Sequence, residues 1–184
     1  LAAYGISERI IGIPVRSSME VVELAQGASP IPVYMDKNAY QSDGVILINR
    51  IKPHTDFHAR YESGLVKMSV IGLGNEKQAS AIHRYGVFGL TTLIPSTAKR
   101  VFNTGKILGG IAMVENAYDD TMLVKALKTD DFLDQEPILL DIARKNMPAL
   151  PVSDMDVLII DRMGKYSRGV GVDPNIIGRT KIFG

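Results

Sequence analysis

The apolar run Gly44-Val45-Ile46-Leu47-Ile48-Asn49 is the stretch that decides the fold of this 184-residue chain. Four large aliphatic residues follow one another without a polar residue, which is typical of a strand buried on both faces in a parallel or mixed sheet. Ligands of open α/β sheets bind beyond the carboxyl ends of the strands. We therefore expect a functional site directly after Asn49.

Strand-like and helix-like segments alternate along the rest of the chain. The predicted strands and extended segments are residues 10–15, 31–34, 44–49, 107–114 and 157–161. The predicted helices are residues 18–24, 63–71, 78–84, 96–102 and 136–146. This alternation predicts an α/β protein with a mixed or parallel sheet flanked by helices.

A proline-marked linker at residues 147–151 divides the predicted elements. We expect one domain over residues 1–147, and a linker with the beginning of a second α/β domain over residues 148–184. The chain starts at Leu1 and ends inside an apparently continuing segment, residues 180–184. We therefore expect a fragment of a longer, two-domain protein.

The overall composition excludes several classes of protein. The 21 basic and 20 acidic residues are well mixed, so a nucleic-acid or anionic-membrane partner has no support. No apolar run approaches the roughly 20 residues that span a bilayer. The chain has no cysteine, which excludes disulfides, thiolate zinc sites and cysteine-bound iron–sulfur clusters. We expect a cytoplasmic protein.

All three histidines, His54, His58 and His83, lie within thirty residues of one another, just after the decisive strand. His54 follows Pro53 in a stiff loop, where an imidazole with a pKa near neutrality can act as a base. His54, Asp56 and His58 together also suggest a metal-dependent hydrolase. Imidazole chemistry is confined to this window.

Two lysines and the start of a predicted helix are the other candidates for the functional site. Lys67 lies between Val66 and Met68, and a lysine in apolar surroundings can act as a nucleophile or covalent anchor. Ser63-Gly64, at a predicted helix start, suggests a non-enzymatic module that binds a nucleotide or another anion. Lys165 lies before a glycine-rich loop and is suited to receive a carboxylate.

These motifs together resemble the nickel-dependent lactate racemase family, the nickel-pincer-nucleotide isomerases. The matching stretches are residues 49–57, 62–68, 71–74, 161–165 and 173–179. The chain resembles a branch of that group other than the lactate enzymes themselves. The domain over residues 1–147 would then be a racemase N-terminal-like catalytic domain that lacks its start.

The resemblance implies a role for each candidate residue. Lys67, preceded by Ser63 and Gly64, would carry the nickel-pincer nucleotide through a thioamide bond. His83, sixteen residues later, would coordinate the nickel. His54 would be the proton acceptor, with His58 as the alternative, and Lys165 would bind the substrate carboxylate.

The implied reaction is the racemisation or epimerisation of a 2-hydroxy acid. A histidine takes the hydroxyl proton, and the Cα hydride passes to the cofactor and returns to either face of the flat keto acid. Cofactor-synthesis enzymes are the implied partners. The family also uses a histidine upstream of this chain, so the fragment alone is expected to be inactive.

Overall fold

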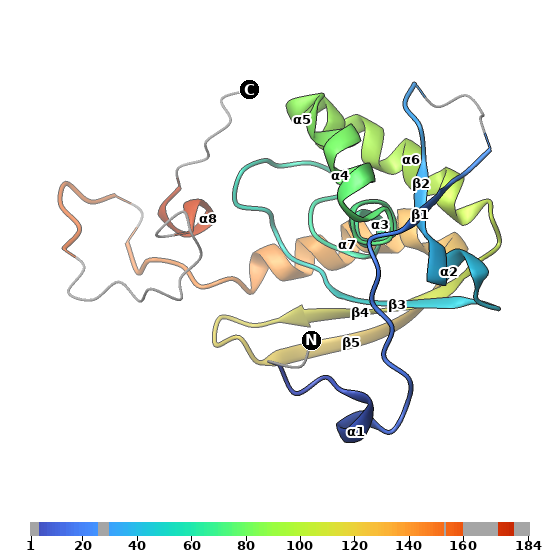
Figure 1. Ribbon diagram of the computed structural model, residues 1–184. Coiled ribbons are helices and arrows are strands. Elements are labelled where there is room, and N and C mark those ends of the chain that lie inside the picture. Colours follow the sequence, from blue (N-terminus) through green and yellow to red (C-terminus); the bar gives the residue numbers. More distant parts are fainter. Residues whose placement is uncertain (1–3, 26–29, 153, 160–172, 179–184) are drawn as a thin grey trace.

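The structure is a computed structural model that describes residues 4–25, 30–152, 154–159 and 173–178 (Figure 1). The strands are β1 (Val21–Glu23), β2 (Tyr34–Asp36), β3 (Val45–Arg50), β4 (Ile107–Glu115) and β5 (Thr121–Lys128). The α-helices are α1 (Glu8–Ile11), α2 (Lys37–Gln41), α3 (Leu65–Lys67), α4 (Asn75–His83), α5 (Gly86–Phe88), α6 (Ile94–Phe102), α7 (Phe132–Lys145) and α8 (Pro174–Ile177). Two π-helical turns, η2 (Met68–Gly72) and η3 (Gly89–Leu93), and a 3-10 turn, η4 (Thr129–Asp131), complete the set.

The main sheet has the strand order β3-β4-β5. β3 and β4 run parallel, with Leu47 opposite Gly110, whereas β4 and β5 run antiparallel, with Ala112 opposite Lys125. A parallel pair needs a long crossover, and the helices from α3 to α6 supply it. The predicted α/β class and mixed sheet are confirmed, although β5 was not among the predicted strands.

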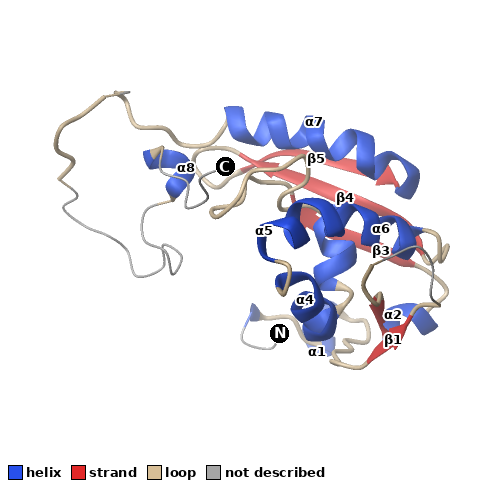
Figure 2. Cartoon of the chain, turned by 90° about the horizontal axis from the view of Figure 1, so that it is seen from above, coloured by secondary structure: helices blue, strands red, loops and turns tan. Residues whose placement is uncertain are grey.

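Helices cover one face of this sheet, where the core lies (Figures 1 and 2). α3 packs on β3 and β4, and α7 packs on β4 and β5. Leu47, Ala112 and Val114 of the sheet meet Leu65 of α3 and Phe132 of α7 in a core where each is at most 4% exposed. The helix that carries Lys67 is thus fixed against the sheet.

The prediction that residues 44–49 are buried on both faces is wrong. Successive side chains of a strand point to opposite faces of the sheet. Leu47 faces the helices, but Ile46 and Ile48 are 54% and 59% exposed. The helices that pack on the sheet, α3 and α7, lie on the opposite side from these two side chains.

The predictions for the first residues are also wrong. No strand forms at residues 10–15: α1 ends at Ile11, where Gly12 adopts a left-handed φ of 71°, and residues 12–15 are neither helix nor strand. The expected helix at residues 18–24 is replaced by β1, in which Val21 and Val22 pair antiparallel with β2. β-branched residues suit a strand, and the partner that selects it lies more than ten residues ahead.

The other predicted helices lie where α3–η2, α4, α6 and α7 lie, with starts displaced by a few residues. The strand predicted at residues 157–161 is not seen at residues 157–159, which are exposed and irregular. Residues 160 and 161 lie outside the described residues. The division into two domains stays a prediction. Among the described residues, no helix has both the length and the apolarity needed to cross a membrane.

Candidate functional site

The chain leaves β3 and forms a loop whose two ends are tied together. The backbone of Lys52 pairs with that of Ser63 through N–H···O bonds of 3.0 and 3.3 Å, an isolated antiparallel bridge. The loop between them carries His54 and His58, and α3 with Lys67 follows directly. The loop that carries His54 and His58 therefore lies at the carboxyl end of a sheet strand, as the sequence predicts.

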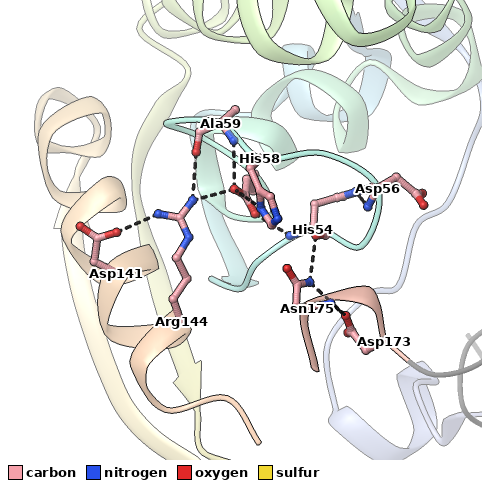
Figure 3. A network of polar contacts seen from close by, with 9 residues as sticks. His54, Asp56, His58, Ala59, Asp141, Arg144, Asp173 and Asn175 are labelled. Carbon is pink, nitrogen blue, oxygen red and sulfur yellow. Dashed lines mark hydrogen bonds and ion pairs between the residues drawn. The ribbon is translucent and has the colours of Figure 1, made fainter. Parts of the chain in front are cut away.

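Glu62 is the centre of this loop, although it is 1% exposed. Its carboxylate accepts hydrogen bonds from the backbone N–H of His54 at 2.6 Å and of Ala59 at 3.0 Å. Arg144 of α7 contacts the same carboxylate at 2.6 Å (Figure 3). One buried carboxylate thus ties two points of the loop to the helical layer.

His54 is held through its backbone and its ring. The Asp56 N–H donates to Nδ1 of the ring at 3.1 Å, and the Asn175 side chain donates to the His54 carbonyl at 3.0 Å. Because Nδ1 accepts, the neutral ring carries its proton on Nε2. Burial lowers the pKa of His54 below its usual 6.5, and the charge of Lys67 lowers it further.

His58 has the opposite arrangement. Its Nδ1 lies 3.4 Å from the Glu62 carboxylate, so Nδ1 carries the hydrogen of the neutral ring and Nε2 has the lone pair. The side chain is 46% exposed. The position of His54 beside Lys67 favours His54 as the base. The tautomer of His58 favours His58, because its lone pair is on Nε2, whereas the lone pair of His54 on Nδ1 already accepts from Asp56.

Lys67 is half-buried in α3, and burial lowers the pKa of its ammonium group below 10.5. The carboxylates of Asp56 and Glu62 oppose this effect only in part. The Phe57 ring centroid lies 5.6 Å from Nζ. A lysine amine with a lowered pKa is a better nucleophile at neutral pH, so the surroundings suit covalent attachment at Lys67.

A pocket of about 270 Å³ opens beside Lys67. Its polar lining residues are Asn49, Arg50, Lys52, Ser63 and Lys67. Met68 and Ile71 supply an apolar wall from the turn that follows α3. The pocket brings together Lys67 and Ser63, two of the predicted site residues.

The start of α3 already has a buried carboxyl group beside it. Glu136 of α7 is 1% exposed, and its Oε2 accepts a hydrogen bond from the Val66 N–H at 2.9 Å. A Cβ atom at Gly64 would lie 2.4 Å from the Glu136 carboxyl carbon, so glycine is needed for this close approach. Glu136 takes the position that a phosphate would occupy on the Ser63-Gly64 helix start.

The structure does not bring every predicted residue to the pocket. His83 is the exposed last residue of α4, and none of the residues that line the pocket belongs to α4. Lys165 lies outside the described residues. Within the described part of the chain, no three histidine, aspartate or glutamate side chains are grouped so that they could hold a metal ion.

The residues that sequence reasoning missed are the ones that hold the loop, namely Glu62, Glu136, Arg144 and Asn175. Two signals were available. Glu62 follows His58 by four residues, and Glu136 lies on the apolar face of α7, where an isolated acid needs a partner. Nothing in the sequence indicates Arg144 or Asn175 as partners.

Comparison with protein-family models, with curated proteins and with solved structures finds no match to this chain. The interpretation of the site therefore rests on the sequence and structure of this chain.

Proposed function

We propose that this chain is the cofactor-carrying part of a racemase or epimerase that acts on 2-hydroxy acids, with a nickel-pincer nucleotide attached to Lys67. The observation that carries the proposal is the setting of Lys67. Its amine is half-buried, has a lowered pKa, and lines a small pocket at the end of a sheet strand. The proposal rests on the motif resemblance for the identity of the cofactor.

Lys67 has the chemistry that an anchor requires. Attachment through nitrogen needs the neutral amine, and burial increases the fraction of that form at neutral pH. The attached nitrogen no longer carries a positive charge. The pKa of His54 then rises, because the charge of Lys67 is one of the causes that lower it.

His54 is the proposed proton acceptor because it lies close to Lys67, as the effect of the lysine charge on its pKa indicates. The acceptor atom is Nδ1, which now accepts from the Asp56 N–H at 3.1 Å and would accept from the substrate hydroxyl instead. Burial and the charge of Lys52 disfavour the imidazolium, so the proton returns readily to the product oxygen. His58 is the alternative acceptor.

The surroundings of Lys67 suit attachment of the cofactor. The metal ligand, by contrast, is for experiment to test, because His83 does not line the pocket. When bound, the cofactor supplies acceptance and return of the hydride, which no side chain of this chain can do. His83 is the proposed nickel ligand, and a pincer ligand brings several donor atoms of its own. Lys165 is the proposed partner of the substrate carboxylate.

The proposal extends to the protein that contains this chain. We propose a cytoplasmic, two-domain enzyme in which residues 1–147 form the catalytic domain. The enzymes that make the cofactor are its proposed partners. The resemblance implies that a second catalytic histidine completes the reaction.

The test is the mass of Lys67 after production together with the cofactor-making enzymes. We expect intact-protein and peptide mass spectra to locate an adduct on Lys67 and metal analysis to find one nickel per chain. Lys67→Arg should lose both, Lys99→Arg on the exposed face of α6 should lose neither, and His83→Ala should lose nickel but keep the adduct. An unmodified Lys67 under these conditions overturns the proposal.

The two other candidate functions have less support. An anion-binding module at the α3 start conflicts with Glu136, which already accepts the Val66 hydrogen bond there. A hydrolase that uses His54, Asp56 and His58 needs a metal cluster, and the described residues contain no such group. Tight zinc binding that is lost in His58→Ala would revive the hydrolase.

A further inference from the structure

The surface of the pocket beside Lys67 is mostly apolar, although most of the residues that line it are polar or charged. Met68 and Ile71 are the large apolar residues among them. Lysine and arginine side chains add carbon stems, which cover apolar surface while the charged ends reach elsewhere. The pocket therefore offers mainly carbon atoms to a ligand.

Several polar groups of the lining residues have partners outside the lining. Arg50 Nη1 contacts the two carboxylate oxygens of Glu115 at 3.0 and 2.8 Å. The Asn49 side chain donates a hydrogen bond to the Gly64 carbonyl at 3.0 Å. Two carboxylates of the histidine loop stabilise the ammonium form of Lys67. The pocket therefore does not require a charged ligand to balance these groups.

The apolar wall is the π-helical turn η2, which follows Lys67 directly. The Leu73 N–H donates to the Met68 carbonyl at 3.0 Å, which is the five-residue spacing of a π turn. Such turns are rare and are frequently found at functional sites. Lys67 and Ile71 are four residues apart, as are Met68 and Gly72, and all four line the pocket. The turn therefore places a carbon wall beside Lys67.

Gly72 keeps the wall in this position. A Cβ atom at Gly72 would overlap Sδ of Met68, so any side chain here would displace the Met68 side chain. The φ angle of Gly72 is not positive, so close packing and not backbone conformation calls for glycine. The shape of the pocket thus depends on a glycine that contacts one of its apolar side chains.

The volume of the pocket limits the size of the group that it can hold. The volume is about 270 Å³. A cavity of about 150 Å³ lined by aliphatic and aromatic side chains is large enough to bind benzene. The pocket therefore has room for an apolar group of about six carbon atoms.

We propose that this pocket binds an uncharged, apolar group of about six carbon atoms, carried by a small molecule that reacts at or beside Lys67. The binding site needs neither the cofactor nor nickel, so it does not rest on the proposed function. One consequence does rest on that function: the pocket then receives the carbon side chain of the 2-hydroxy acid. Substrates with a side chain larger than the methyl group of lactate are preferred.

The experiment uses the reactivity of Lys67 in the chain produced without the cofactor-making enzymes. The amine adds to an aldehyde, water leaves to give an imine, and sodium cyanoborohydride supplies the hydride that reduces the imine to a stable secondary amine. The probes are acetaldehyde, butanal, hexanal and octanal at one fixed pH. Peptide mass spectrometry gives the labelling rate of Lys67 relative to that of exposed Lys99, which corrects for the reactivity of each aldehyde.

We expect the relative rate at Lys67 to rise from acetaldehyde to hexanal, by up to about fourfold for each CH₂ group that the pocket buries. Ile71→Ser and Met68→Gln should each reduce this dependence on chain length, because they remove apolar surface from the wall. Gly72→Ala should shift the preference to shorter aldehydes, because it displaces Met68. Ile138→Ser, at an exposed position of α7, is the matched control and should change nothing. Circular dichroism checks that each variant is folded.

The wild-type chain alone can overturn the proposal. It fails if the relative rate at Lys67 does not depend on chain length, or if no aldehyde labels Lys67. It also fails if Ile71→Ser and Met68→Gln, both folded, keep the wild-type dependence. A missing cofactor adduct on Lys67 would leave the proposal intact, and a flat chain-length series would leave the anchor role of Lys67 intact, so the two failures are distinguishable.

Discussion

Replacing Glu136 by glutamine should remove a pH dependence of stability that originates in this one buried carboxyl group. Burial raises the pKa of Glu136 from 4.5 to about 7, and the N–H groups of Val66 and Leu65 oppose the rise only in part. Among the described residues no partner contacts its Oε1 atom. Glutamine keeps the shape and a carbonyl acceptor for Val66 but cannot ionise.

The sign and size follow from proton linkage. Between pH 4.5 and 7 the folded chain holds this proton and the unfolded chain has lost it, so the stabilising contribution falls as pH rises through that window. At about 1.4 kcal/mol for each pH unit, the whole change is about 3 kcal/mol. Below pH 4.5 the contribution is fully present.

Urea unfolding followed by circular dichroism at several pH values between 4 and 8 measures this effect. The free energy of unfolding of Glu136→Gln relative to wild type should rise by about 3 kcal/mol from the lowest to the highest pH. With a urea slope of about 2 kcal/mol per molar, the midpoint moves by about 1.5 M. The curve of Glu76→Gln, at an exposed position of α4, should run parallel to that of wild type. Parallel curves for Glu136→Gln as well would refute the reasoning.

Three further predictions concern the loop. Arg144→Gln should cost about 2 kcal/mol of unfolding free energy, less than for a fully buried pair because Arg144 is 38% exposed; adding Glu62→Gln should recover part of the loss, and a further loss would contradict the pairing. By NMR titration the pKa of His54 should lie below 6.5 and should rise in Lys67→Gln, since the charge of Lys67 is one of the causes that lower it; an unchanged titration would remove Lys67 as a cause. Asn175→Ala should reduce hydrogen-exchange protection of residues 54–59 while the global unfolding free energy changes by less than about 1.5 kcal/mol; unchanged protection would mean that this contact does not hold the loop.

The sequence predicts a helix or strand correctly where the residues of that element alone carry the pattern. The aliphatic run of β3 predicts a strand without reference to a partner, although it does not show which face is buried. The apolar positions of α7 recur with the helical period, because a buried face imposes its period on the sequence. β1 and β5 are different. Each is a strand because another strand lies beside it, β2 for the one and β4 for the other, and that partner is not visible in a short window.

The same distinction separates the predicted from the unpredicted part of the site. His54 and Lys67 are close together in the sequence, so their residue types and spacing point to one another. Glu62 and Arg144 are 82 residues apart, and Val66 and Glu136 are 70 residues apart. Only the packing of α7 against α3 brings them into contact, and packing partners cannot be read from the spacing in one chain.

The two carboxylates that fix this segment differ in one neighbour. Glu62 and Glu136 are equally buried, at 1% exposed. Glu62 has a guanidinium at 2.6 Å, so the His54 end of the segment is held by an ion pair. Among the described residues, Glu136 accepts only from backbone N–H groups, and burial raises its pKa to about 7, so the helix start that carries Lys67 changes its local charge near neutral pH. Since a negative charge at a helix start stabilises the helix, ionisation of Glu136 strengthens its contact with α3 while adding a desolvation cost. The fold therefore tolerates a buried acid at the start of the helix that carries Lys67, and ionisation of Glu136 near neutral pH changes the surroundings of the anchor residue.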